Sequence, residues 1–254
     1  MQAQASPSPE RSPGAPTRPA DAVTPAPERY SRGFLIITAL FVTTLIVSNL
    51  IAVKLIDVAG LIMPAGVIIF PVSYIVGDVL TEVYGYARAR TVIWLGFGCN
   101  LLAVLAIAVA GALPAAGFWE GQAAWNLILG YAPRLLAASF LAYLVGELAN
   151  AYVLARMKVA TEGRHLWART IGSTLVGQGL DSAIFILIAF WGTIPSAGLV
   201  AAILTQWLVK SGYEALATPL TYAVTGFLKR SEGIDAFDRD TDFRPLAWLG
   251  QRAR

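Results

Sequence analysis

Long apolar runs separated by short polar stretches dominate the chain from residue 34 onward. Each run is close to or above the roughly 20 residues that a helix needs to cross the hydrocarbon core of a bilayer. The pattern predicts six membrane-spanning helices, at residues 34–53, 62–84, 92–112, 134–156, 168–191 and 197–228. The last run exceeds that length, so we expect it to tilt, to kink at Pro219 or to project beyond the membrane.

Composition agrees with this pattern. Hydrophobic residues make up 56% of the chain and charged residues 14%, with a mean hydropathy of +0.61. A soluble domain carries about 25% charged residues. The predicted fold class is therefore all-α, a polytopic membrane bundle of six transmembrane helices.

The basic residues orient this bundle. If the six spans are right, sixteen of the nineteen Lys and Arg residues fall on one side of the membrane. By the positive-inside rule that side is cytoplasmic, which places both termini in the cytoplasm. The net charge of +3 and the pI of 9.1 then follow from topology, and we predict no nucleic-acid partner.

The chain divides by composition into three parts. Residues 1–33 hold seven of the fourteen prolines and lack the apolar stretch of a signal peptide, so we predict a disordered Pro/Ala-rich cytosolic tail. Residues 34–230 form the six-helix transmembrane domain. Residues 231–254 are polar and mixed in charge, and we predict a short cytosolic tail.

Several kinds of chemistry find no support in the sequence. Cys99 and His165 are the only cysteine and histidine, which argues against a disulfide and a metal site. A GxxxxGK[ST] phosphate loop is absent, as are the HExxH, GxSxG and DDxxD patterns. We predict neither a cofactor nor an enzymatic activity.

Polar residues inside the last two spans are the strongest functional signal. A charged side chain at bilayer depth costs about 2.5–3.5 kcal/mol, so it usually faces a partner or a polar cavity. Gln178 and Asp181 share one side of their helix, and Gln206, Lys210 and Glu214 share one face of the next. The predicted substrate-binding residues are Asn49, Gln178, Asp181, Gln206, Lys210 and Glu214.

Structural alternatives exist for two of these positions. Lys210 and Glu214 can pair at i,i+4 as a neutral salt bridge, although Lys210 can also serve Asp181. Asn49 can instead serve as a hydrogen-bonding contact between helices, with no part in substrate binding.

A second set of ionisable residues suggests a gate, a structural lock or a site of proton coupling. Asp78 and Glu82 are four residues apart on one helical face, where like charges disfavour each other unless a cation or a proton intervenes. The candidates are Asp78, Glu82, Arg90 and Glu147. The alternative is an interfacial charge cluster that only fixes topology.

The polar residues of the last two spans would suit a planar heterocycle. A guanine-like edge offers two adjacent N–H donors and a carbonyl acceptor, which a carboxylate and an amide or ammonium can satisfy together. This chemistry permits such a ligand without selecting it over other polar solutes.

A family resemblance indicates which solute is bound. The segments SNLIAVKLI, FPVSYIVGDVLTEVYGYARAR, AYLVGELANAYVLARMK, STLVGQGLDSAIF and WLVKSGYEALATPLTY resemble, in order, the queuosine precursor transporters, a vitamin-uptake-like family. The resemblance implies a six-span bacterial inner-membrane importer of 7-cyano-7-deazaguanine and 7-aminomethyl-7-deazaguanine. Asp78, Glu82 and Arg90 match the family signature, whereas Glu147 and Asn150 stand where the family favours an amide and an aspartate.

The resemblance leaves the energy source open between facilitated and proton-coupled transport. It implies no obligatory protein partner and does not decide whether the chain forms homo-oligomers. Two other functions remain as alternatives: the substrate-binding subunit of a multi-component vitamin importer, and a membrane-embedded enzyme.

Overall fold

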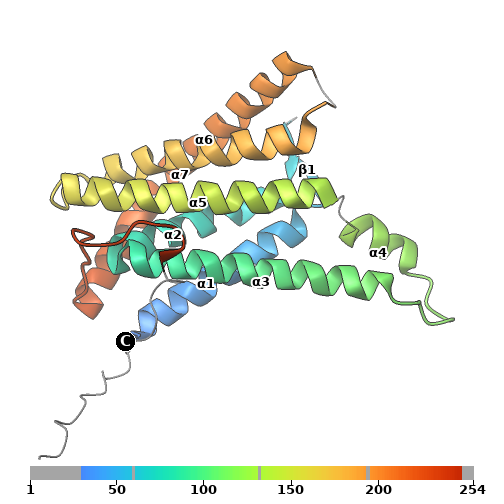
Figure 1. The fold of residues 1–254 in the computed structure, drawn as a ribbon, viewed down its shortest axis with the longest axis horizontal. Helices are drawn as coiled ribbons and strands as arrows, with labels where there is room; N and C mark the ends of the chain where they lie inside the picture. The colour runs from blue at the N-terminus through green and yellow to red at the C-terminus, as the bar shows by residue number, and fades with distance from the viewer. Residues whose placement is uncertain (1–29, 59–60, 131–132, 193–194, 248–254) are drawn as a thin grey trace, which may run out of the picture. The chain divides into compact units, whose positions relative to one another are not determined.

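The computed structural model describes residues 30–58, 61–130, 133–192 and 195–247. The chain divides into two units, residues 1–30 and 31–254. The predicted disordered tail lies almost entirely outside the described residues, and every helix belongs to the second unit (Figure 1).

The described part of the second unit is built mainly from α-helices. Their bounds are α1 Arg32–Ile51, α2 Phe70–Tyr84, α3 Tyr86–Ala112, α4 Gln122–Leu129, α5 Pro133–Ala160, α6 Leu166–Phe190 and α7 Ser196–Glu232. By length and composition, α1, α3, α5 and α6 qualify as candidate membrane spans in the described part of the chain. The described helices thus confirm a helical bundle in which four helices are long and apolar enough to cross a membrane.

The second predicted span begins differently from the prediction. Strand β1, Leu55–Val58, pairs antiparallel with β2, Leu61–Pro64, and a 3₁₀ turn at Ala65–Ile68 leads into α2. Pro71 stands in the first turn of α2, where its missing N–H costs nothing. The prediction of one helix over 62–84 was therefore wrong at its start, although the short hairpin leaves the all-α class in place.

Helix α4 was also not predicted. It occupies part of the segment between the third and fourth predicted spans. Its eight residues include none that is buried, so it forms without a core of its own.

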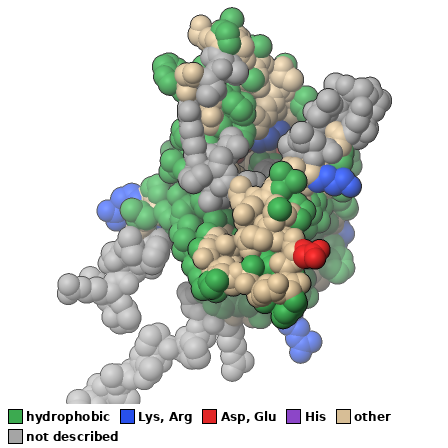
Figure 2. All heavy atoms as spheres, turned by 90° about the vertical axis from the view of Figure 1, so that its right-hand side faces the viewer, with side chains coloured by type: hydrophobic (Ala, Val, Ile, Leu, Met, Phe, Trp, Pro, Cys, Tyr) green, Lys and Arg blue, Asp and Glu red, His purple; other side chains and the backbone are tan. Residues whose placement is uncertain are grey.

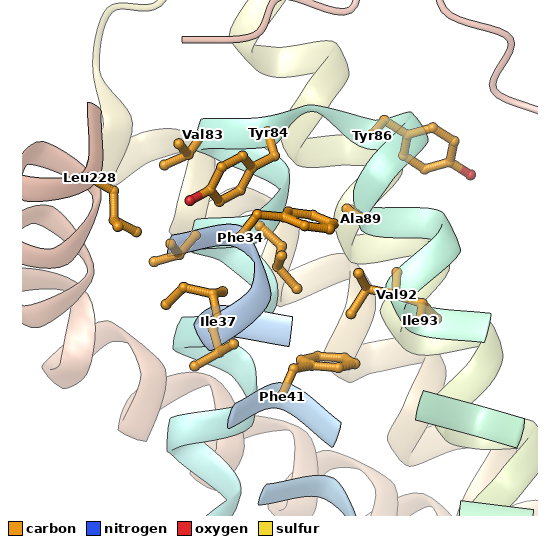
Figure 3. Close-up of a cluster of buried hydrophobic side chains, with 14 of the residues drawn as sticks. Phe34, Ile37, Phe41, Val83, Tyr84, Tyr86, Ala89, Val92, Ile93 and Leu228 are labelled. Carbon is orange, nitrogen blue, oxygen red and sulfur yellow. The ribbon is translucent and has the colours of Figure 1, made fainter. Parts of the chain in front are cut away.

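Helix α2 lies at the centre of the bundle. It packs against α1, α3, α5 and α7, and every residue from 75 to 86 is buried. On one side it joins the main hydrophobic cluster, where the Phe34 ring meets the Tyr84 ring edge-on at 5.1 Å (Figure 3). The cluster includes Phe34, Ile37 and Phe41 of α1, Val83 of α2, Val92 and Ile93 of α3, and Leu228 of α7.

The outer surface of the bundle is apolar. Large hydrophobic side chains are exposed along the helices, such as Leu102, Leu105, Val109, Leu208 and Leu216. The face that carries α4 shows mainly hydrophobic and uncharged side chains (Figure 2). Many exposed apolar side chains of this size are expected of a protein that contacts lipid.

At one end of the bundle, the first residues of some helices lie beside the last residues of others. Glu232, at the end of α7, accepts hydrogen bonds from Ser31 and Gly33 at the start of α1 and from Tyr84 at the end of α2. Glu82 near the end of α2 pairs with Arg169 near the start of α6. We call this the basic end, because Lys158, Arg169 and Lys229 surround Glu82 there.

Two glycines, Gly146 and Gly177, allow α5 and α6 to pack closely. A Cβ atom on Gly177 would lie 2.7 Å from Cβ of Asn150 and 3.0 Å from the carbonyl oxygen of Gly146. Small residues permit such close helix contacts in membranes, where apolar burial does not drive association.

We expect Gly177→Ala to destabilise the bundle by about 1–3 kcal/mol, because the new methyl group forces the two helices apart. Gly179→Ala is a matched control on the same helix, since its Cβ would meet Trp207 at 3.4 Å, an ordinary contact. Thermal unfolding of the two purified variants in detergent measures the difference. Equal melting temperatures would contradict the proposed tight packing.

Candidate functional site

A small cavity lies where α2, α5 and α6 meet. Its lining residues are Tyr74, Tyr143, Gly146, Glu147, Asn150, Thr174, Gly177, Gln178 and Asp181. The space open to the centre of a water-sized sphere is about 10 Å³, which is room for roughly one water molecule. The structure therefore describes the cavity in a closed form.

Unpartnered oxygen atoms mark this cavity. The hydroxyl of Tyr143, Oε1 of Glu147, Oδ1 of Asn150 and Oε1 of Gln178 are buried and have no hydrogen-bond partner among the described residues. Buried polar groups are usually satisfied, so several orphans in one place need an explanation. Three of the four belong to carboxyl or amide groups and can accept hydrogen bonds from a ligand.

Neighbouring carboxylates orient the two amides. Nδ2 of Asn150 donates to Oδ1 of Asp78 over 2.8 Å, and Nε2 of Gln178 lies 3.5 Å from Oε2 of Glu214. Each carboxylate engages the donor end of an amide, which leaves the carbonyl end without a partner. Thr174 in turn holds Glu214 by a hydrogen bond of 2.6 Å to Oε1.

The cavity is richer in carboxyl groups than in cations. Lys210 of α7 pairs with Asp181 of α6 at 2.5 Å. No Lys or Arg forms an ion pair with Asp78, Glu147 or Glu214 within the described residues. The Lys210–Glu214 pair within α7 does not form, because Lys210 reaches the facing helix instead.

The structure brings together most of the predicted site. Gln178 and Asp181 line the cavity, while Glu214 and Lys210 hold them from α7. Glu147, a gate or proton-coupling candidate, lines the cavity itself. Their roles in binding stay predictions.

Asn49 and Gln206 do not line this cavity. The side-chain amide of Asn49 donates to the carbonyl of Leu45, one turn earlier in its own helix. A substrate contact by Asn49 or Gln206 remains a prediction without a geometric argument.

Sequence reasoning did not assign four of the lining side chains to the site: Tyr74, Tyr143, Asn150 and Thr174. A signal was present for two of them. Tyr74 precedes Asp78 by four residues and Tyr143 precedes Glu147 by four, so each tyrosine shares a helical face with a buried carboxyl group.

Glu82 belongs to an ion network at the basic end rather than to the cavity. Its Oε1 lies 2.7 Å from Arg169 Nη2, 2.7 Å from Lys229 Nζ and 3.6 Å from Lys158 Nζ. The network therefore joins α2, α5, α6 and α7 around a fully buried carboxylate.

Asp235 extends the network beyond α7. It pairs with Lys158 and, at 2.9 Å, with Lys229. Partial burial alone would raise the pKa of Asp235, but the hydrogen bonds from both lysines outweigh it and hold the pKa below its ordinary value. Asp235 is thus a stable counter-ion for the two lysines at neutral pH.

A second carboxylate at the basic end, that of Glu232, contacts the start of α1. Partial burial opposes ionisation of Glu232, yet its hydrogen bonds from Ser31, Tyr84 and the Gly33 N–H lower its pKa below the ordinary value. Glu232 therefore links α1, α2 and α7 as a carboxylate at neutral pH.

Arg90 anchors the segment that follows α7. Its Nη1 donates to the carbonyl oxygens of Asp242 and Arg244 over 2.6 and 2.8 Å. Trp94 donates to the carbonyl of Pro245, and the Asp238 carboxylate accepts from the Tyr86 N–H. In its described part, the predicted C-terminal tail is thus docked on α3, and Arg90 contacts it rather than Asp78 or Glu82.

Comparison with known proteins identifies the family. Residues 64–224 match the family described as "Putative vitamin uptake transporter". The chain belongs to this family. It is also 31% identical over 184 residues to the "Probable queuosine precursor transporter" of Bacillus subtilis (strain 168), covering 71% of this chain and 79% of that one.

A further relative has a similar name. The "Queuosine precursor transporter" of Escherichia coli (strain K12) is 30% identical over 126 residues, which cover 50% of this chain and 54% of that protein. No solved structure matches the chain. The family and its apolar helices make this a multi-pass membrane protein, and the names of its relatives agree with a transporter rather than an enzyme.

Proposed function

We propose that this vitamin-uptake-family protein imports queuosine precursors, 7-cyano-7-deazaguanine and 7-aminomethyl-7-deazaguanine, across the bacterial inner membrane. The observation that carries the proposal is the set of unpartnered acceptors at the cavity, on Glu147, Asn150 and Gln178. The names of the two relatives supply the solute.

The chemistry of the solute fits these acceptors. A 7-deazaguanine presents N–H donors at its ring and at its exocyclic amine, and it has one carbonyl acceptor. Carboxylate and amide oxygens accept from such donors. Tyr74 and Tyr143 add aromatic rings at the same cavity, where a planar heterocycle can stack.

The proposed topology has six crossings with cytoplasmic termini. The starts of α1, α3 and α6 and the ends of α5 and α7 carry basic residues, which favours a cytoplasmic basic end. Helix α2 has 15 residues, about 22 Å at 1.5 Å each, and is too short to cross about 30 Å alone. The β1–β2 hairpin and the 3₁₀ turn complete that crossing in our proposal.

The closed cavity implies that transport requires a conformational change. A cavity with room for one water cannot hold a deazaguanine, so its walls separate when the solute enters. Transporters bind near the bilayer centre and expose the site alternately to each side. We propose that the ion network of Glu82 holds the cytoplasmic side shut in this conformation.

Direct binding and uptake test the proposal. Purified protein should bind both deazaguanines more tightly than guanine, and its expression should restore queuosine in transfer RNA of cells that lack precursor synthesis and their own importer. Gln178→Leu should abolish the rescue, because it removes a lining acceptor, whereas Gln122→Leu on α4 is the matched control. Rescue by Gln178→Leu at the wild-type level would refute the proposed site.

Uptake assays also test the energy source and the alternative function as a subunit of a multi-component importer. Uptake in a host without a vitamin-importer ATPase would exclude an obligatory energising module. Dependence of uptake on the proton gradient would then separate proton-coupled from facilitated transport.

A further inference from the structure

The charge balance at the cavity carries an inference about which precursor binds better. Four carboxyl groups lie at or beside the cavity, on Asp78, Glu147, Asp181 and Glu214. Within the described residues only Asp181 has a basic partner, Lys210. A cationic ligand would favour the ionised form of these carboxyl groups, and a neutral one would not.

The three carboxyl groups without a basic partner are not equivalent. Asp78 accepts a hydrogen bond from Asn150, and Glu214 accepts one from Thr174. Glu147 accepts no hydrogen bond from any described residue, and its side chain is 4% exposed. It is therefore the group that gains most from a new donor.

Glycine makes the position of Glu147 possible. A Cβ atom on Gly77 would lie 2.2 Å from Oε1 of Glu147, so the carboxyl group fits against α2 only because residue 77 lacks a side chain. Glu147 is thus seated at the wall between α2 and α5, beside the orphaned carbonyls of Asn150 and Gln178.

We propose that Glu147 is the counter-ion for an ammonium group on the ligand, and that the cavity prefers 7-aminomethyl-7-deazaguanine over its 7-cyano analogue. This inference rests on the proposed function. The aminomethyl group is a primary alkylamine and is protonated at neutral pH, as a lysine side chain is. The nitrile is neutral and ends in an acceptor, which an ionised Glu147 repels.

Binding of both compounds to purified protein and to Glu147→Gln tests the preference. The amine should bind wild type about ten- to a hundredfold more tightly than the nitrile, the range expected for one hydrogen bond to a charged group. Glu147→Gln should remove that advantage and leave nitrile affinity within a fewfold of wild type. Glu120→Gln, an exposed acid near α4, is the matched control and should change neither affinity.

The outcomes separate this inference from the proposed function. Binding of neither compound to wild type would overturn both. Equal binding of the two compounds, or equal weakening of both by Glu147→Gln, would overturn the counter-ion role alone. Tighter binding of the nitrile, lost in Glu147→Gln, would mean that a protonated Glu147 donates to the nitrile, which also overturns the inference.

Folding of the variant is controlled independently. Glu147→Gln keeps the shape of the side chain and removes a buried carboxyl group without a basic partner, so its melting temperature should equal or exceed that of wild type. Gly77→Ala supplies a second route, because it displaces the carboxyl group without changing its charge. It should weaken the amine more than the nitrile, and equal losses would again contradict the inference.

Discussion

Glu82→Gln is expected to destabilise the protein by about 3–5 kcal/mol, the cost of removing one partner from a buried ion pair. Arg169 and Lys158 are each 1% exposed, and among the described residues the substitution leaves Arg169 without an acidic partner and Lys158 with Asp235 alone. For a chain of this size the loss corresponds to roughly 6–20 °C in melting temperature. Thermal unfolding in detergent measures it.

Two further variants sharpen this test. Glu162→Gln removes an exposed carboxylate from the loop at the same basic end and should change the melting temperature little. Glu82→Asp keeps the charge and should retain part of the stability. If Glu82→Gln has the same melting temperature as the wild type, the network adds no net stability. If it also transports as well as the wild type, the network does not hold a gate.

Breaking the Asp181–Lys210 pair is expected to abolish uptake. Asp181→Asn and Lys210→Met each remove one member of a partly buried pair whose charged groups lie 2.5 Å apart. A double-mutant cycle should therefore show a coupling free energy of about 1–3 kcal/mol in stability. The double variant should be more stable than the less stable single variant.

Uptake by the double variant separates two roles of Asp181. If Asp181 contacts the solute, the double variant regains stability but remains inactive. If the pair serves only as a neutral structural bridge, uptake returns together with stability. Additive losses of stability in the cycle would contradict the pairing itself.

Helix positions were largely predictable from the sequence, because a bilayer demands long apolar runs. The spans predicted at 92–112 and 168–191 correspond to α3 and α6, which extend only a few residues further at the basic end. The start of α2 was not predictable from hydropathy. Residues 61–68 are as apolar as a membrane-spanning helix. Only the spacing of Pro64 and Pro71 indicates another conformation.

Most of the ionisable and amide residues of the site were predictable from the sequence, but the ion pairs that they form were not. Helical periodicity placed Gln178 and Asp181 on one face, and they line one cavity. Whether Lys210 pairs with Glu214 or with Asp181 depends on the rotation and axial shift of α7 against α6, which a single sequence does not specify. For the same reason Glu147 was grouped with Glu82, although one lines the cavity and the other lies in the ion network.

The docked segment after α7 has a practical consequence for handling this protein. Residues 235–245 supply a counter-ion to Lys158 and backbone acceptors to Arg90 and Trp94. Shortening the gene at the end of the last helix would remove these acceptors from Lys158, Arg90 and Trp94. Purification tags and fluorescent reporters therefore belong beyond residue 247, where they leave that segment in place.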